Sequence, residues 1–129
     1  MKKLFYILFF LFPVVVSAQF NLYKDSPLDY AWKCVGNAGF SAGDVSFYIS
    51  LVFNPSGEPY VAFSDGSLSY KATVMKFDGV NWVYVGLPGF TTAGATFTNI
   101  AFDSSGQLYI AFSDETYSYK ASVKREKFF

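Results

Sequence analysis

The 129-residue chain is rich in apolar side chains and carries equal numbers of basic and acidic residues. Hydrophobic residues make up 52% of it and aromatic residues 22%, whereas charged residues make up 16% and histidine is absent. This composition excludes a disordered chain and chemistry that depends on histidine, and the zero net charge argues against binding to nucleic acid or to an anionic membrane surface.

The N-terminus has the composition of a secretory signal peptide. Two lysines precede an apolar run over residues 4–16, and small residues follow it. This order of regions predicts cleavage between Ala18 and Gln19. The apolar run is shorter than the about 20 residues that cross a bilayer, so an uncleaved membrane anchor is the less favoured alternative, and no membrane span is expected once the signal peptide is removed. We therefore predict a signal peptide over residues 1–18, an N-terminal linker over 19–29, and a protein that is secreted or held in the cell envelope or at the cell surface.

Cys34 is the only cysteine, so it cannot form a disulfide within the chain. Without a histidine or a second cysteine to activate it, we expect it to be a small buried hydrophobe on a strand; a dimerising or a reactive thiol is the alternative.

An internal repeat occupies most of the remaining chain. The segment from Leu51 to Asp65 is matched by the segment from Ile100 to Asp114, and Trp32 with the Val-Gly pair that follows it is matched in the same way by Trp82. More than half of the positions from 51 to 74 are identical to those from 100 to 123, which chance does not explain. A period of about 49 to 50 residues is typical of propeller blades.

Each repeat is predicted to contain four strands, because β-branched and aromatic residues gather in short runs that Gly, Pro, Asn and Asp separate. In the first repeat the strands are expected at about 47–53, 59–64, 70–77 and 80–86. The second strand is apolar on both faces, so both faces of its sheet should be covered. Hairpin turns are expected at Asn54-Pro-Ser-Gly57 and at Asp78-Gly79.

The fold class predicted is therefore all-β, with antiparallel four-stranded blades of a propeller type, over residues 30–129. Repeat 1 covers about 47–86 and repeat 2 about 96–124. Propellers close with at least four blades, which at this repeat length needs about 200 residues, so the propeller is incomplete.

The run from Ile100 to Asp114 resembles the core of NHL-type propeller repeats, and Phe77-Asp78-Gly79 with Trp82 resembles the rear of a kelch repeat. The whole unit is similar to repeats of secreted propeller proteins of Bacteroidota-type bacteria. Phe63 and Ser64 stand where kelch repeats have paired glycines, and the third strand lacks the arginine of NHL repeats. The ligand-binding roles of those families therefore do not carry over.

The second repeat stays in register through Val123 and then departs, since Lys124 and the residues after it replace the Met75–Gly79 segment of the first. This departure predicts a fragment of a longer repeat protein, and the alternative is a short protein that pairs its blades by oligomerising. In either case apolar sheet faces lack neighbours, and self-association through unpaired blades is expected.

Candidate ligand-binding residues are few. Asp65 and Asp114 occupy equivalent loop starts; paired carboxylates can hydrolyse glycosides, but an aspartate after a strand more often caps the following loop. Either could also supply a ligand or two to calcium, although no closely spaced carboxylate run supports such a site. We predict no metal, cofactor or catalytic residue. The tyrosines are expected in cross-strand packing, with a carbohydrate- or peptide-stacking surface as the alternative for Tyr60, Tyr70, Tyr109, Tyr117 and Tyr119.

Tyr117 is the best surface candidate, because its counterpart in the first repeat is Leu68. The sequence thus predicts a secreted, non-catalytic binding or scaffold module whose partner is a protein or a carbohydrate. A propeller-type extracellular hydrolase using carboxylates and a cell-envelope structural protein are the alternatives.

Export is tested by the N-terminus of the mature protein. When the full chain is expressed in a bacterium with a general secretion pathway, we expect a product that begins at Gln19, measured by intact mass and N-terminal sequencing. Ala18→Asp should block cleavage, because the site requires a small residue, whereas Gln19→Asn should be cleaved normally. Secreted wild-type protein that retains residues 1–18 would contradict the prediction.

Overall fold

The computed structural model describes residues 31–46 and 48–127. The chain divides into two units, Met1–Trp32 and Lys33–Phe129, and the described strands all belong to the second. The predicted signal peptide, its cleavage site at Ala18 and Gln19, and the linker lie outside the described residues. Within the described part, no helix is long and apolar enough to cross a membrane.

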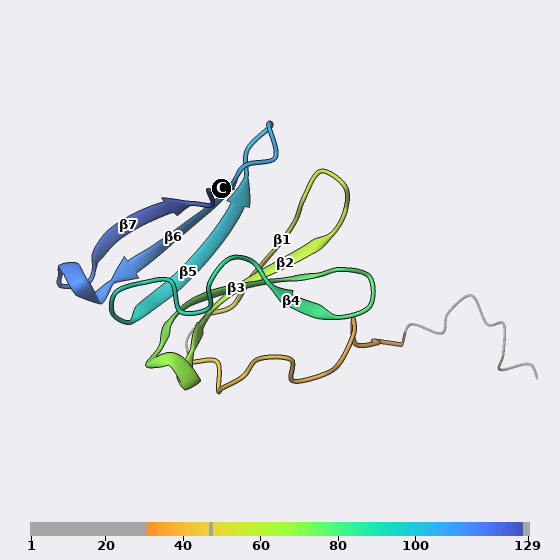
Figure 1. Cartoon of the computed structure of the whole chain (residues 1–129), viewed down its shortest axis with the longest axis horizontal. Helices are drawn as coiled ribbons and strands as arrows, with labels where there is room; N and C mark the ends of the chain where they lie inside the picture. Colours follow the sequence, from red (N-terminus) through yellow and green to blue (C-terminus); the bar gives the residue numbers. More distant parts are fainter. Residues whose placement is uncertain (1–30, 47, 128–129) are drawn as a thin grey trace, which may run out of the picture. The chain divides into compact units, whose positions relative to one another are not determined.

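Two antiparallel sheets make up the second unit (Figure 1). Sheet A has four strands in chain order: β1 (Ser50–Phe53), β2 (Pro59–Asp65), β3 (Lys71–Phe77) and β4 (Trp82–Tyr84). Sheet B has three: β5 (Ala95–Phe102), β6 (Leu108–Asp114) and β7 (Lys120–Arg125). Short 3-10 helices, η1 (Gly66–Leu68) and η2 (Glu115–Tyr117), join the second and third strands of each sheet. The all-β, antiparallel fold class is confirmed, and neither sheet closes on itself within the described residues.

The first hairpin turn of each sheet has the geometry that its residues predict. The Asn54 side chain accepts hydrogen bonds from the backbone N–H groups of Ser56 and Glu58 at 3.0 and 2.8 Å. Asp103 does the same in sheet B for Ser105 and Gln107, at 2.9 Å each. In both turns a glycine with positive φ completes the reversal of the chain. Residues with a side chain adopt this backbone conformation only at a higher conformational energy.

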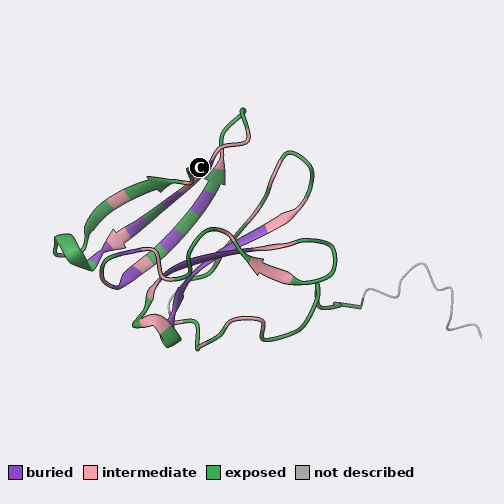
Figure 2. Cartoon of the chain, in the orientation of Figure 1, coloured by how far each residue is buried: buried purple, intermediate pink, exposed green. Residues whose placement is uncertain are grey.

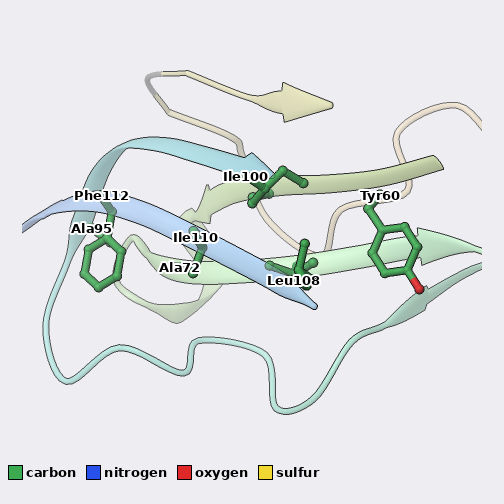
Figure 3. Close-up of a cluster of buried hydrophobic side chains, with 9 residues drawn as sticks. Tyr60, Ala72, Ala95, Ile100, Leu108, Ile110 and Phe112 are labelled. Atoms are coloured by element: carbon green, nitrogen blue, oxygen red, sulfur yellow. The ribbon is translucent and has the colours of Figure 1, made fainter. Parts of the chain in front are cut away.

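The two sheets stack face to face through one apolar core. Side chains of β2 and β3 point toward sheet B, and side chains of β5 and β6 point back (Figure 3). The buried residues of this core are Tyr60, Ala62, Ala72, Val74, Ala95, Ile100, Leu108, Ile110 and Phe112. Tyr60 meets Phe102 edge to face, with ring centres 4.9 Å apart. The alanines of sheet A are completely buried, because their small side chains let sheet B approach closely.

The opposite face of sheet A is covered in part by the segment that precedes it. Phe40 packs edge-on against Phe63 and stacks on Trp82, with ring centres 6.4 and 4.3 Å apart. The Trp82 indole N–H also donates to the Val35 carbonyl at 2.7 Å. β2 is therefore buried along nearly its whole length, as its two apolar faces predict, whereas β7 is almost entirely exposed (Figure 2).

Three expectations are wrong. The fourth strand is limited to Trp82–Tyr84 rather than 80–86, because Gly79 and Gly86 on either side of it have positive φ. The first strand begins at Ser50 rather than 47, because Tyr48 has a φ of 60° that interrupts extended pairing; Phe97, with a φ of 54°, marks the matching interruption in β5. Cys34 is exposed and outside any strand, because no described strand lies beside the segment that carries it.

The shared core is tested by a truncation inside it. Ile110 is only 5% exposed, so Ile110→Ala should lower the free energy of unfolding by about 2–5 kcal/mol. Val80→Ala is the matched control, because Val80 is 74% exposed in a turn and its truncation should change stability by less than about 0.5 kcal/mol. Urea unfolding followed by circular dichroism measures both. Equal effects of the two substitutions would contradict a core between the sheets.

Acid should weaken the turn at Asp103. Hydrogen bonds, first from the Ser105 hydroxyl and then from the backbone N–H of Gln107, lower the pKa of Asp103 from its ordinary value of 3.8. A carboxylate whose pKa is lowered by folding stabilises the fold above that ordinary value, and this stabilisation is lost as the pH falls through the folded pKa.

The matched variant is Asp103→Asn, which keeps the acceptor that Asn54 supplies in sheet A but does not titrate. We expect its urea midpoint to fall less steeply than that of the wild type below about pH 4. Identical acid profiles would show that Asp103 contributes nothing to the pH dependence.

Candidate functional site

Asp65 and Asp114 each cap a 3-10 turn. Asp65 Oδ1 accepts from the Ser67 N–H at 3.0 Å and from the Ser67 hydroxyl at 2.6 Å, and Asp114 Oδ1 accepts from the Thr116 N–H at 3.0 Å. Each turn ends in two consecutive residues with positive φ: Ser69 and Tyr70 in sheet A, Ser118 and Tyr119 in sheet B. Of the three roles weighed for these aspartates, which are loop capping, glycoside hydrolysis and calcium binding, the structure therefore shows the capping role.

The surroundings of Asp114 keep it ionised. Burial by itself raises the pKa of this carboxyl, but hydrogen bonds with the Ser122 and Thr116 side chains outweigh burial, so that the pKa is lowered. A general acid needs the opposite shift. In sheet A the residue equivalent to Ser122 is Thr73, whose hydroxyl accepts from the Gly89 N–H at 2.9 Å. Asp65 Oδ2 is buried there and has no hydrogen-bond partner among the described residues.

Tyr117 lies at the end of η2 and is 63% exposed. It shares that turn with Asp114, whereas Asp65 lies in the separate turn that ends β2. The three predicted ligand residues thus belong to two turns, and the structure does not gather them around one cavity. The described residues also contain no group of three or more acidic or cysteine side chains that could hold a metal ion.

The two repeats place an acidic side chain on opposite sides of the same loop contact, a difference that the sequence analysis did not predict. In the first repeat the acidic residue is Asp44, on the segment before β1, and it faces Gly66. In the second repeat the loop residue is Gly94, and the opposing Glu115 accepts from its N–H at 3.0 Å. The sequence does contain a signal for this difference. When the loop before the first strand is included in the alignment of the repeats, Asp44 aligns with Gly94 and Gly66 aligns with Glu115.

A cavity of about 210 Å³ opens between the sheets at the end of β7. Its lining combines apolar side chains such as Val85, Leu87 and Phe90 with the charged residues Lys124, Arg125, Glu126 and Lys127. Lys124 Nζ lies 3.4 Å from the Phe90 carbonyl oxygen. Burial raises the pKa of Glu126. These charged residues lie where the second repeat departs from the first: Arg125 has a basic counterpart in Lys76, but Lys124 and Glu126 replace Met75 and Phe77 of sheet A.

Exposed apolar residues gather on the two outer sheet faces. The outer face of sheet A carries Ile49, Leu51 and Phe53, each 58–59% exposed, around an apolar groove of about 340 Å³. We call it the leading face, and it consists of Ile49, Leu51, Phe53, Pro59 and Val61. The outer face of sheet B, which we call the trailing face, consists of Ala101, Tyr109, Ala111, Ala121 and Val123; Val123 is 67% exposed.

Comparisons with known protein families, curated proteins and solved structures found no match. The roles of the residues above are therefore argued from this chain alone.

The exchange of the carboxylate is tested by a double substitution. A methyl group at Gly66 would overlap the Asp44 carboxylate, so Gly66→Ala should lower the free energy of unfolding by about 1–3 kcal/mol. Asp44→Gly, which copies Gly94, should restore most of that loss in the double variant. Thermal unfolding of the four proteins of this cycle measures the coupling. Additive losses would mean that the two side chains do not meet.

Proposed function

We propose that this chain is an exported, non-catalytic scaffold module of propeller-type repeats, which acts through its sheet faces. The observation that carries the proposal is the contrast between the aspartates, which are engaged in turns, and the apolar side chains, which are exposed on the sheet faces. The aspartates that could support hydrolysis are occupied as turn caps, whereas Leu51, Phe53 and Val123 leave more than half of their surface in water. Large apolar patches of this kind on a folded protein are typical of interaction surfaces.

The sheet arrangement supports the propeller-type part of the proposal. Each sheet is antiparallel with its strands in chain order, and successive repeats stack face to face. Repeat units of this kind bury their apolar faces against neighbours, and the outer faces of sheets A and B are those that the described residues leave partly uncovered.

The hydrolase alternative receives no support from a particular observation. Asp65 and Asp114 lie in separate turns, and the pKa of Asp114 is shifted away from what an acid catalyst needs.

The availability of the leading face is tested with an apolar dye. Anilinonaphthalene sulfonate fluoresces when it binds exposed apolar surface, and we expect it to bind the dilute, exported full chain while near-ultraviolet circular dichroism reports an intact fold. Leu51→Lys should reduce the signal, because it places a charge in the groove. Val80→Lys is the control, since it removes an equally exposed apolar side chain from a turn outside both faces.

Absence of dye binding to the native protein, or the same fluorescence from Leu51→Lys and wild type, would contradict an exposed interaction face. Equal losses from Leu51→Lys and Val80→Lys would contradict it as well.

A further inference from the structure

The contact between sheets A and B supplies a template for the two faces that remain open. Sheet A uses Tyr60, Ala62, Ala72 and Val74 to cover sheet B. The equivalent positions of sheet B are occupied by identical residues, Tyr109, Ala111, Ala121 and Val123, and they form the trailing face. The trailing face therefore repeats a surface that already binds a partner sheet within this chain.

The leading face matches the other half of that contact. Sheet B presents Ile100, Phe102, Leu108, Ile110 and Phe112 to sheet A. Sheet A carries similar residues at the equivalent positions of its outer face, which are Leu51, Phe53, Pro59, Val61 and Phe63. Leu51 and Phe53 are exposed, whereas Val61 and Phe63 are already buried against Phe40 and Trp82. One chain thus has the two complementary halves of a single interface, on opposite sides.

The backbone edges are complementary too. After β4, the segment of residues 85–95 continues along the part of the β3 edge that β4 leaves unpaired: the N–H groups of Val85, Phe90 and Ala95 donate to the carbonyls of Val74, Ala72 and Tyr70 at 2.9, 3.1 and 2.9 Å. The Thr91 hydroxyl accepts from the Ala72 N–H at 3.0 Å. In sheet B the corresponding strand is β7, which is an edge strand.

The segment of residues 35–45 has the backbone geometry of residues 85–95 before any partner is present. Gly36 and Gly39 have φ values of 69° and 65°, against 70° and 63° for Gly86 and Gly89. The Ser41 hydroxyl donates to the Gly43 carbonyl at 2.8 Å, as the Thr91 hydroxyl does to Ala93. Phe40 lies on the outer face of sheet A, as Phe90 lies on the inner face of sheet B. The segment is therefore preorganised to pair with a strand like β7.

We propose that a second copy of this chain docks head to tail on the first, so that its leading face covers the trailing face and its residues 33–45 pair with the free edge of β7. The inference rests on the proposed function, because it names the partner of the same faces. Tyr109 of one copy then packs against Phe53 of the next, as Tyr60 packs against Phe102. Lys33 lies opposite Arg125. Solvent and salt screen the repulsion between these two positive charges, because both side chains are exposed.

The assembly that follows is heterologous, because two different faces meet. Such an interface uses one face of each copy and leaves the other open, so association continues beyond the dimer unless a ring closes. Sedimentation velocity on the exported full chain should therefore give species that grow with concentration from the monomer through successive multiples of its mass. A wild-type chain that stays monomeric at all concentrations would overturn the proposal, even if it binds the apolar dye.

Two charged variants separate the faces. Ala121→Arg blocks the trailing face and Leu51→Arg blocks the leading face, and both positions are exposed, so each monomer should keep its fold. Each variant alone should be monomeric. An equimolar mixture should form a one-to-one dimer and nothing heavier, because one open leading face meets one open trailing face. Val80→Arg should assemble as the wild type does.

If either single variant forms dimers, or if the mixture stays monomeric, the head-to-tail arrangement is wrong. If the wild type precipitates, each single variant should be soluble, and insolubility of both variants would overturn the proposal.

The register is tested by a disulfide. Within sheet A, Met75 pairs with Tyr84, so Lys124 should pair with Cys34 of the next copy. Cα atoms of antiparallel partners are about 4.5–5.5 Å apart, within the range that a disulfide spans. Lys124→Cys should therefore give a ladder of covalent multimers on non-reducing gels. Lys120→Cys, at the other end of β7, should not; equal ladders from both variants would overturn the pairing.

Discussion

The packing of β2 and β3 against β5 and β6 is the interaction on which the rest of the structure depends. A single antiparallel sheet with apolar side chains on both faces is not stable in water by itself, because its apolar faces are buried only when other elements pack against them. Ala62 and Ala72 have no exposed surface, so the second sheet can approach closely enough to bury Ile110 and Phe112. Burial of one such large side chain contributes about 1.5–3 kcal/mol, which makes this contact the main source of stability.

The same constraint explains why the outer faces are apolar. Because the second repeat keeps most residues of the first, it also keeps the apolar residues on both faces of its sheet, whether or not a neighbouring sheet covers them. Val74 is buried against sheet B, but the identical residue Val123 lies on the outer face and is 67% exposed. The structure thus has one sheet-to-sheet interface inside the chain and carries residues like its two halves on the outer faces, which is the basis of the proposed scaffold role and of the proposed head-to-tail contact.

Local chemistry allowed much of the fold to be predicted. The hairpin turns were predictable from Asn54, Asp103 and the glycines that follow them, and the burial of β2 was predictable from its two apolar faces. Cys34 was misjudged because burial of that segment needs a strand beside it, and no short-range pattern reports whether one is present. The interruptions at Tyr48 and Phe97 were missed for a related reason, since aromatic residues favour strands and give no sign of a positive φ. The capping role of Asp65 and Asp114 was predictable, but the exchange of Asp44 for Glu115 is visible in the sequence only when the loop before the first strand is included in the alignment of the repeats.

The central claim is that one sheet-to-sheet interface operates both within the chain and between chains. Hydrogen exchange of the backbone amides of Lys120–Arg125, measured by mass spectrometry on the exported full chain over a range of concentrations, tests it most directly. We predict that the β7 amides that do not bond to β6 exchange rapidly in dilute protein and become protected as the concentration rises, while β2 is protected throughout. Exchange of β7 that is independent of concentration would contradict it.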